Sequence, residues 1–360
     1  MNSTPKIHID FYASVIDNYG DMGFAVNLAL SLHTKYTGTI IRFFSDDAIL
    51  FQKLFSGKVP HWIEYTSLEI LKSPNPPPPS ALIYSFFDYP LQKEYLSKFP
   101  YHKTIISFSY FLLHKGLESL HGTTYVLESG YDTVIHFIPS LLPKGGGVII
   151  NPLIEKEIQK SLGKGIFDGR KNFFQRNMHY LFEDRKGPIQ DMLQKKWIFI
   201  FVYPSTLAKI LSIIENDTSG TIFWISGYVG DLQTTHNCRI VPFLSLVDYG
   251  VFQNLCDVNI VRGENSLCQG LLSGKPLLWD IYKESNGAHL EKTEDFLTWI
   301  VPYFESNLEY ISIARDFMNT GNPESFARFL QSYQDFEEIG ERISREVHRE
   351  SDLVEKLLAL

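Results

Sequence analysis

The sequence DFYASVIDNYGDMGFAVNLALSL, from Asp10 to Leu32, indicates which kind of fold this chain adopts. An apolar, β-prone run leads into a turn with two acids and two glycines, and a helix-like apolar pattern follows. In open α/β sheets, such a turn lies at the carboxyl end of the strand, where ligands bind. Asp17 and Asp21 are therefore placed for base chemistry on a molecule bound above the sheet.

The same residues also fit an ordinary turn. Asp-Asn-x-Gly is common turn chemistry, and Asp21 could simply cap the helix that follows. Gly20 and Gly23 permit a backbone geometry and a close approach that a Cβ would forbid. The segment matches neither the Gly-Lys-Ser phosphate loop nor the GxGxxG dinucleotide fingerprint. From the local pattern, a catalytic pair of acids and a structural turn both remain open.

Length, composition and charge exclude several classes of protein. A chain of 360 residues with 44% hydrophobic and 21% charged residues is expected to form two soluble globular domains. A net charge of −8 argues against nucleic acid as the main ligand. Cys238, Cys256 and Cys268 have no disulfide-frame or zinc-ligand spacing. Because neither a signal-peptide core nor an apolar run of about 18 residues occurs, we expect a cytoplasmic protein that does not enter a membrane.

Two series of alternating strand and helix patterns divide the chain. The first series of expected strands is Lys6–Tyr12, Thr39–Phe44, Trp62–Tyr65, Ala81–Phe86 and Lys103–Phe108. The second series is Trp197–Tyr203, Thr221–Ser226, Arg239–Phe243, Asp257–Val261 and Pro276–Ile281. We therefore expect an α/β protein with two doubly wound domains, 1–150 and 151–335, facing a central cleft. A C-terminal helix, 336–360, is expected to follow, and one possible arrangement is that this helix packs against the first domain.

A second candidate site follows the expected strand Asp257–Val261. The segment Arg262-Gly263-Glu264-Asn265-Ser266 opens an amphipathic helix pattern, which places backbone N–H groups beside an arginine and a hydroxyl. This combination favours an anion such as phosphate. Alternatively, Asn265 or Ser266 only caps the helix while Arg262 pairs with a nearby acid. The local pattern does not separate these two interpretations.

Three aromatic residues lie at the ends of expected strands in the second series. Phe201 and Tyr203 end one strand, and Phe243 ends another. Taken singly, an aromatic residue of a buried strand is better explained as part of the core than as a ligand contact.

Two long motifs resemble the EarP family, bacterial protein-arginine rhamnosyltransferases that modify translation elongation factor P. VIDNYGDMGFAVNLALSL (Val15–Leu32) is similar to the family motif V-[IV]-D-N-[FY]-G-D-[IV]-G and the helix after it. CDVNIVRGENSLCQGLLSGKPLLWDIY (Cys256–Tyr282) is similar to a second motif that contains N-[FIL]-V-R-G-E-D-S and W-x-I-Y, and Ala288-His289-Leu290 follows as in the family. Weaker likeness at Phe137–Gly147 and Trp197–Pro204 extends the resemblance over most of the chain.

The resemblance implies a GT-B glycosyltransferase with two Rossmann-like domains, the first holding the acceptor and the second the nucleotide sugar. The implied donor is dTDP-β-L-rhamnose, and the implied acceptor is one arginine of elongation factor P. Transfer would invert the anomeric centre. No cofactor and no metal are implied, and the second half of the chain has no Asp-x-Asp motif of the kind that binds a metal diphosphate.

The resemblance also assigns roles to individual residues. Asp17 and Asp21 match the two functional aspartates of the family, with Asp21 in the place of the general base, and Glu264 completes the catalytic set. The residues expected to contact dTDP-rhamnose are Asn18, Tyr19, Gly20, Gly23, Phe201, Tyr203, Phe243, Leu246, Arg262, Gly263, Asn265 and Ser266.

Three positions depart from the family pattern. Asn265 stands where an aspartate is usual, Leu246 where a thymine-reading glutamine is common, and Ser109 where the acceptor domain has an acid. The change at Asn265 alters the charge beside the diphosphate, and that at Leu246 alters the selectivity for thymidine. The change at Ser109 alters how the partner protein is bound. Leu246 and Ser109 favour one alternative, a GT-B transferase with another nucleotide sugar or acceptor. A second alternative is a catalytically weak relative that binds elongation factor P or a nucleotide, although the presence of both Asp17 and Asp21 argues against it.

Overall fold

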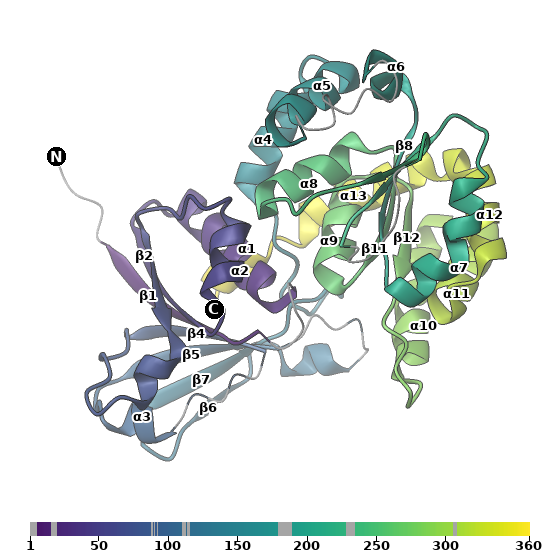
Figure 1. Cartoon of the computed structure of the whole chain (residues 1–360). Helices are drawn as coiled ribbons and strands as arrows, with labels where there is room; N and C mark the ends of the chain where they lie inside the picture. Colours follow the sequence, from purple (N-terminus) through teal and green to yellow (C-terminus); the bar gives the residue numbers. More distant parts are fainter. Residues whose placement is uncertain are drawn as a thin grey trace. The chain divides into compact units, whose positions relative to one another are not determined.

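The computed structural model describes residues 6–15, 20–87, 89, 91, 93–109, 113, 116–178, 189–227, 235–304 and 308–360. The chain forms two compact units: unit 1 comprises Met1–Leu153 and Glu350–Leu360, and unit 2 comprises Ile154–Arg349. Each unit is an α/β body built on one largely parallel sheet (Figure 1). Among the helices in the described ranges, none is long and apolar enough to cross a membrane.

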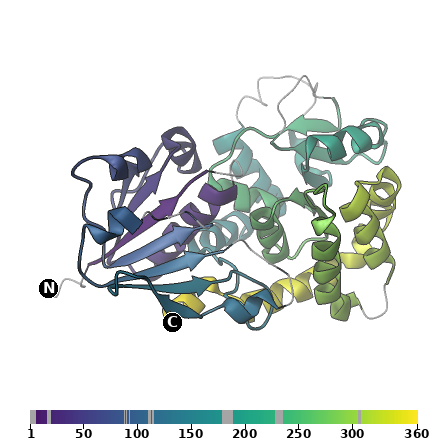
Figure 2. The ribbon, with the colours of Figure 1, turned by 90° about the horizontal axis from the view of Figure 1, so that it is seen from below.

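Unit 1 is built on a sheet whose described strands run in the order β3-β2-β1-β4-β5-β7-β6 (Figure 2). The strands are β1 (Ile7–Ala13), β2 (Thr39–Ser45), β3 (Ile63–Ser67), β4 (Leu82–Phe86), β5 (Lys103–Phe108), β6 (Thr124–Val126) and β7 (Asp132–Phe137). Every pairing is parallel except that of β6 with β7. The chain order reverses between β1 and β4, so the loops after these two strands lie at a topological switch point.

The alternation of side chains along β1 explains why both faces of this sheet are covered. Phe11 packs on Phe86, on the face where Phe24 from the first helix also contacts Phe86. Tyr12 points to the opposite face and stacks on Phe44, with ring centroids 4.6 Å apart. Because aromatic rings pack on both faces, β1 is a central strand of the core and its carboxyl end is firmly supported.

The helices of unit 1 include one from the extreme C-terminus. They are α1 (Gly20–Lys35), α2 (Ala48–Leu54), η1 (Leu68–Lys72), α3 (Lys93–Ser97), η2 (Leu117–Leu120) and α14 (Leu353–Leu358). Lys35 at the end of α1 forms ion pairs with Asp352 at 2.5 Å and Glu355 at 2.7 Å. The Val148 N–H donates to the Ser351 carbonyl at 2.6 Å. These contacts attach the C-terminal segment to unit 1.

The segment 336–360 is therefore not the single helix that the sequence suggested. It forms α13 (Glu337–Glu350), which belongs largely to unit 2, and then α14 in unit 1. Asp352 causes the break, because its side chain caps α14 by accepting hydrogen bonds from the N–H groups of Val354 and Glu355. A side-chain cap of this kind starts a new helix after an extended residue.

Unit 2 is built on a parallel sheet whose described strands run in the order β10-β9-β8-β11-β12. These strands are β8 (Trp197–Phe201), β9 (Ile222–Ile225), β10 (Cys238–Ile240), β11 (Val258–Arg262) and β12 (Leu277–Asp280). They correspond in order to the second series of expected strands, as β1 to β5 correspond to the first. The order reverses between β8 and β11, which places a second switch point there.

Helices cover both faces of the unit 2 sheet. They are α4 (Pro152–Leu162), α5 (Ile166–Asn177), α6 (Ile189–Gln194), α7 (Pro204–Glu215), α8 (Leu246–Leu255), α9 (Glu264–Leu272), α10 (Ala288–Ile300), η4 (Val301–Phe304), α11 (Leu308–Thr320), α12 (Pro323–Ser332), η5 (Tyr333–Phe336) and α13. In Figure 1, α8 and α9 lie on one side of the strands, and α7, α11 and α12 lie on the other. This layering is that of a doubly wound Rossmann-like domain.

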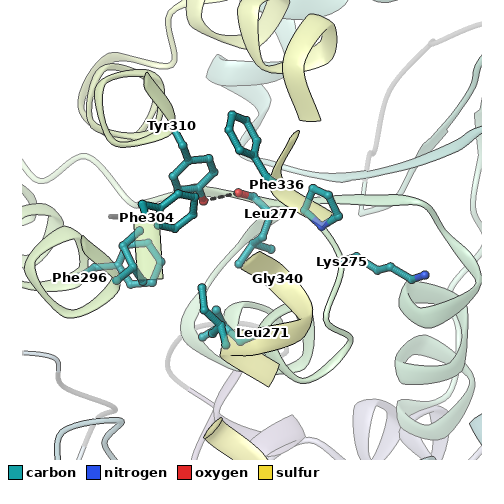
Figure 3. A pocket seen from close by; sticks show the side chains of 11 residues that line it. Leu271, Lys275, Leu277, Phe296, Phe304, Tyr310, Phe336 and Gly340 are labelled. Carbon is teal, nitrogen blue, oxygen red and sulfur yellow. Dashed lines mark hydrogen bonds between the residues drawn. The ribbon is translucent and has the colours of Figure 1, made fainter. Parts of the chain in front are cut away.

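A small apolar cavity lies within unit 2 between β12 and the C-terminal helices (Figure 3). Phe296, Phe304 and Tyr310 line it, and the Tyr310 hydroxyl donates to the Leu277 carbonyl at 2.5 Å. Burial raises the pKa of Tyr310, so this hydroxyl stays protonated and keeps donating. The cavity volume is about 20 Å³, the space of roughly one water molecule. The cavity is a packing feature of the core and cannot hold a nucleotide sugar.

Candidate functional site

The first motif folds as expected into a strand, a turn and a helix. β1 ends at Ala13 and α1 begins at Gly20, so the turn lies at the carboxyl end of a central strand. Asp17, Asn18 and Tyr19 lie outside the described residues. Asp21 is in the first turn of α1 and is 3% exposed. At this position the helix dipole favours a negative charge, which suits both a helix-terminal acid and a base held in its ionised form.

The segment that enters this turn is held by an acid from the neighbouring strand. Asp46 directly follows β2, which pairs with β1. Its Oδ2 accepts a hydrogen bond from Ser14 Oγ at 2.6 Å, and its Oδ1 accepts one from the Val15 N–H at 3.0 Å. Sequence reasoning did not single out Asp46, although its position at the end of an expected strand was a signal.

Gly23 is not required by the packing of α1. No described atom lies within 4 Å of the place where a Cβ would stand on Gly23. Both Gly20 and Gly23 are partly exposed at the start of α1. Among the described residues, nothing therefore blocks the close approach of another group to Gly23.

In unit 2, three of the residues expected to contact the nucleotide sugar lie together at the carboxyl ends of two adjacent strands. Arg262 ends β11, and its Cζ lies 4.6 Å from the centroid of the Phe201 ring and 4.8 Å from that of Tyr203. Its Nη1 also donates to the Val202 carbonyl at 3.4 Å. Such cation–π contacts fix the guanidinium plane. The described residues include no acid that forms an ion pair with Arg262, and the two interpretations of this residue both stay open.

The helix that follows Arg262 begins after a glycine in the N-cap position. Gly263 is the N-cap of α9 with a φ of +70°, a conformation that favours glycine, and a glycine has no side chain with which to cap the helix. Asn265 and Ser266 lie inside the first turn, so neither is the cap that the alternative interpretation proposed. Ser266 is buried, and its Oγ accepts a hydrogen bond from the Tyr249 hydroxyl at 2.9 Å. The N-terminus of α9 thus has the form of an anion site next to a guanidinium.

Glu264 has a cationic partner in this structure. It is the first residue of α9 and forms an ion pair at 2.7 Å with Lys292 from α10. The Glu264 side chain is 32% exposed, so solvent reaches the pair. Glu264 can therefore exchange this partner for another cation at low cost.

Two further residues expected to contact the nucleotide sugar, Phe243 and Leu246, lie between the end of β10 and the first residue of α8. Phe243 is 48% exposed, which is not the burial expected of a core aromatic residue. Leu246 is the first residue of α8 and is partly buried. The preceding residue, Ser245, caps this helix, because its Oγ accepts a hydrogen bond from the Asp248 N–H at 3.2 Å. In unit 1, Ser109 directly follows β5, and its N–H donates to the Phe137 carbonyl at 3.1 Å.

Sequence reasoning missed two residues beside this cluster. Tyr282 follows β12 and is 62% exposed, and its ring lies 5.5 Å from the Tyr203 ring between centroids. Asp280 ends β12 and is fully buried, with the Tyr203 N–H as one of its hydrogen-bond donors at 2.8 Å. Both belong to the quoted motif WDIY at the end of an expected strand, which was the available signal.

Solved structures of similar fold are glycosyltransferases. The structure that describes EarP-mediated arginine glycosylation of translation elongation factor EF-P aligns over 98% of both chains with a TM-score of 0.61 and 19% identity. The glycosyltransferase SnogD from Streptomyces nogalater aligns over 98% of this chain and 99% of its own, with a TM-score of 0.52 and 12% identity. The fold is that of the GT-B glycosyltransferases, which confirms the predicted fold class.

The sequence comparisons identify the family. The profile of the family described as Elongation-Factor P (EF-P) rhamnosyltransferase EarP matches residues 9–360. The protein-arginine rhamnosyltransferase of Pseudomonas putida KT2440 is 25% identical over 318 residues, 80% of each chain. The enzyme of the same name from Shewanella oneidensis MR-1 is 26% identical over 341 residues, 82% of this chain and 81% of its own. This chain therefore belongs to the EarP family of glycosyltransferases, which confirms the resemblance found in the two motifs.

Proposed function

We propose that this enzyme transfers L-rhamnose from dTDP-β-L-rhamnose to an arginine side chain of translation elongation factor P, with inversion at the anomeric carbon. The main supporting observation is the Arg262 guanidinium, which lies over two aromatic rings beside the glycine-capped N-terminus of α9. That arrangement suits a nucleoside diphosphate. The family description and the names of the curated relatives support rhamnose, arginine and elongation factor P.

In this proposal unit 2 holds the donor. Arg262 binds the diphosphate oxygens as a fork, and the first-turn amides of α9 with Gly263 and Ser266 add further donors. Asn265, in place of the usual aspartate, removes a negative charge from the neighbourhood of the diphosphate. These groups stabilise the charge on the leaving dTDP, so we propose that no metal or other cofactor takes part. Removal of divalent cations with a chelator should then leave the transfer rate unchanged.

In this proposal, the thymine of the nucleotide sugar contacts the aromatic residues. Phe201 and Phe243 would offer ring faces for thymine, and Tyr203 would lie beside the diphosphate, next to Arg262. Leu246 is apolar and cannot read the base edge by hydrogen bonds. Thymine would therefore be held mainly by stacking and apolar contact, which favours the 5-methyl group only moderately.

Unit 1 would hold the acceptor and carry the base. A guanidinium has a pKa above about 12 and must lose a proton to become a nucleophile. Asp17 would orient the arginine, with Asn18, Tyr19, Gly20 and Gly23 shaping the turn around the sugar. As the arginine nitrogen forms its bond to the anomeric carbon, the bond from that carbon to the diphosphate oxygen breaks. The proton leaves the nitrogen for the Asp21 carboxylate.

Glu264 would contribute a second carboxylate near the acceptor. In this structure a lysine ammonium already neutralises it, since Lys292 lies 2.7 Å away. An incoming guanidinium would compete with Lys292 for the same oxygen atoms. We propose that this exchange sets part of the affinity for the acceptor arginine.

The test is the intact mass of elongation factor P from the same organism after incubation with enzyme and dTDP-β-L-rhamnose. The proposal predicts a mass increase of one deoxyhexose. It predicts no increase when the acceptor arginine of elongation factor P is replaced by lysine, or when the enzyme carries Asp21→Asn. An increase that appears only with another nucleotide sugar would favour the alternative donor that Leu246 suggests. No increase with any donor would overturn the proposal.

A further inference from the structure

Asp280 is a fully buried carboxylate at the carboxyl end of β12, on the same edge of the sheet as Arg262. Its Oδ2 accepts a hydrogen bond from the Tyr203 N–H at 2.8 Å. Its Oδ1 accepts one from Thr206 Oγ1 at 2.9 Å and forms an ion pair with Lys283. A buried charge is tolerated only when it is paired and hydrogen-bonded, and here both oxygens have donors.

Two of these donors belong to the start of α7. Tyr203 is the N-cap of α7, Pro204 is its first residue, and no described side chain of α7 itself caps the helix. Asp280 provides the acceptor from a different strand, at the end of the helix where the dipole favours negative charge. The Asp280 carboxylate thus holds the segment between β8 and α7 in place through hydrogen bonds from Tyr203 and Thr206, although Asp280 belongs to a different strand.

This loop carries the residues around Arg262. The Tyr203 ring lies 4.8 Å from Arg262 Cζ and 5.5 Å from the Tyr282 ring. β8 and β12 are not neighbours, because β11 lies between them. The hydrogen bond from the Tyr203 N–H to Asp280 therefore connects the segment after β8 to the end of β12. Phe201 and Arg262 end β8 and β11, and Tyr282 follows β12, so these residues lie close to the connection.

We propose that Asp280 is a positioning residue for the nucleotide-sugar site: it holds the backbone of Tyr203 so that the Tyr203 ring and the Arg262 guanidinium keep the arrangement that binds the diphosphate. The inference rests on the proposed function, which assigns dTDP to this cluster. Asp280 does not touch the donor, and its effect is transmitted through Tyr203.

The chain offers a matched control at the opposite edge of the same sheet: Asp257, which directly precedes β11. Asp257 accepts a hydrogen bond from the Trp197 N–H, at the start of β8, at 2.7 Å. It also forms an ion pair with Arg170 at 2.8 Å. Asp257 therefore makes the same kinds of bond as Asp280 in the same unit, but at the amino end of the sheet. A loss of general stability affects both residues, whereas a loss of positioning affects only Asp280.

The experiment is calorimetric titration of dTDP into the folded full-length enzyme, with thermal unfolding measured on the same samples. Asp280→Ala should weaken dTDP binding by about tenfold or more, on the scale of a lost buried hydrogen-bond acceptor. Asp280→Asn keeps an oxygen for the Tyr203 N–H and should stay within about threefold of wild type. Asp257→Ala should lower Tm while leaving the dTDP affinity within about threefold. If an alanine variant does not fold, the leucine substitution at the same position, closer in volume, carries the same expectation.

Two results would overturn the proposal. One is wild-type dTDP affinity in Asp280→Ala, and the other is an equal loss of affinity in the alanine variants of Asp280 and Asp257. Arg262→Ala separates this failure from failure of the proposed function. If the wild type binds dTDP and Arg262→Ala weakens it while Asp280→Ala does not, the positioning role is wrong and the donor site stands. If the wild type does not bind dTDP, the donor assignment itself is wrong.

Discussion

The two units use the same local structure for opposite chemistry. In unit 1, the segment from β1 to α1 carries acids, with Asp21 buried at the helix start. In unit 2, the ends of β8 and β11 carry a guanidinium and aromatic rings beside the start of α9. Both segments lie at the switch point of a parallel sheet, where ligands bind. In the proposed function, the residues of each loop determine whether that loop provides a catalytic base or an anion site.

The anchoring of the two segments also differs. Asp46 in unit 1 is an exposed acid that holds Ser14 and Val15, the residues before the turn. Asp280 in unit 2 is fully buried and holds the N-terminus of the next helix. A buried, ion-paired anchor restricts its loop more strongly than an exposed one. We infer that the donor cluster is preorganised, and that the two units can be tested separately by measuring donor binding and turnover.

The largest effect is expected from Asp21→Asn. The amide keeps the size of the side chain but cannot accept the proton, so transfer should fall by about two to four orders of magnitude. The affinity for dTDP should stay close to wild type, because the residue belongs to unit 1. The rate follows from the time course of intact mass of elongation factor P, and the affinity from calorimetry. Near wild-type turnover would remove Asp21 from the role of base.

Arg262→Ala should show the reverse pattern. Loss of a charge-assisted, bidentate partner is worth about 1.5–3 kcal/mol, so dTDP should bind roughly ten- to a hundredfold more weakly. Arg262→Lys should recover only part of the affinity, since an ammonium forms no planar fork and stacks less well on Phe201 and Tyr203. Calorimetry with dTDP measures both variants. An unchanged affinity in the alanine variant would place the diphosphate elsewhere.

Leu246→Gln should change selectivity more than affinity. The wild type is expected to prefer dTDP over UDP by a modest margin, because a missing methyl group in an apolar pocket is worth about 1–3 kcal/mol. A glutamine at the start of α8 should increase this preference if it faces the base. Competition binding of dTDP, UDP and GDP to both proteins measures the margin. Strong discrimination in the wild type, unaltered by the substitution, would show that Leu246 does not face the base.

The smallest effect is expected from Lys292→Met, which removes the cationic partner of Glu264 and keeps the length of the side chain. Because the pair is partly exposed, its strength is on the order of 0–1 kcal/mol. The KM for elongation factor P should therefore fall by no more than about fivefold, with dTDP affinity unchanged. Steady-state kinetics with varied elongation factor P measures this. A rise in KM would mean that Lys292 supports the acceptor site instead of competing with it.

Much of the fold could be predicted from the sequence because the parallel strands are continuous apolar runs. Ile198–Ile200 and Ile222–Ile225, for example, are buried on both faces. Two strands were missed: all residues of the short edge strand β6 are exposed, and β7 is only partly buried along its length. The single C-terminal helix was predicted wrongly, since Ser351 and Asp352 look like ordinary polar helix residues until the cap forms.

The candidate site could be predicted only in part from the sequence. Arg262 and Tyr203 were assigned to the site through the family motifs, since the local pattern alone did not decide their roles, and their stacking results from the pairing of β11 with β8. Asp46 and Asp280 also lie at strand ends, but that position alone does not determine what they bind. Their partners are backbone N–H groups in other loops, and only the strand register determines which loop each acid reaches.

The most direct test of the account is fragmentation mass spectrometry of elongation factor P after reaction with the wild-type enzyme and dTDP-β-L-rhamnose. The account predicts a single deoxyhexose on the side chain of one arginine. It also predicts that the same peptide stays unmodified with Asp21→Asn enzyme that still binds dTDP. A deoxyhexose on a serine, threonine or lysine, or equal modification by Asp21→Asn, would contradict the central claim that unit 1 provides the base for arginine transfer.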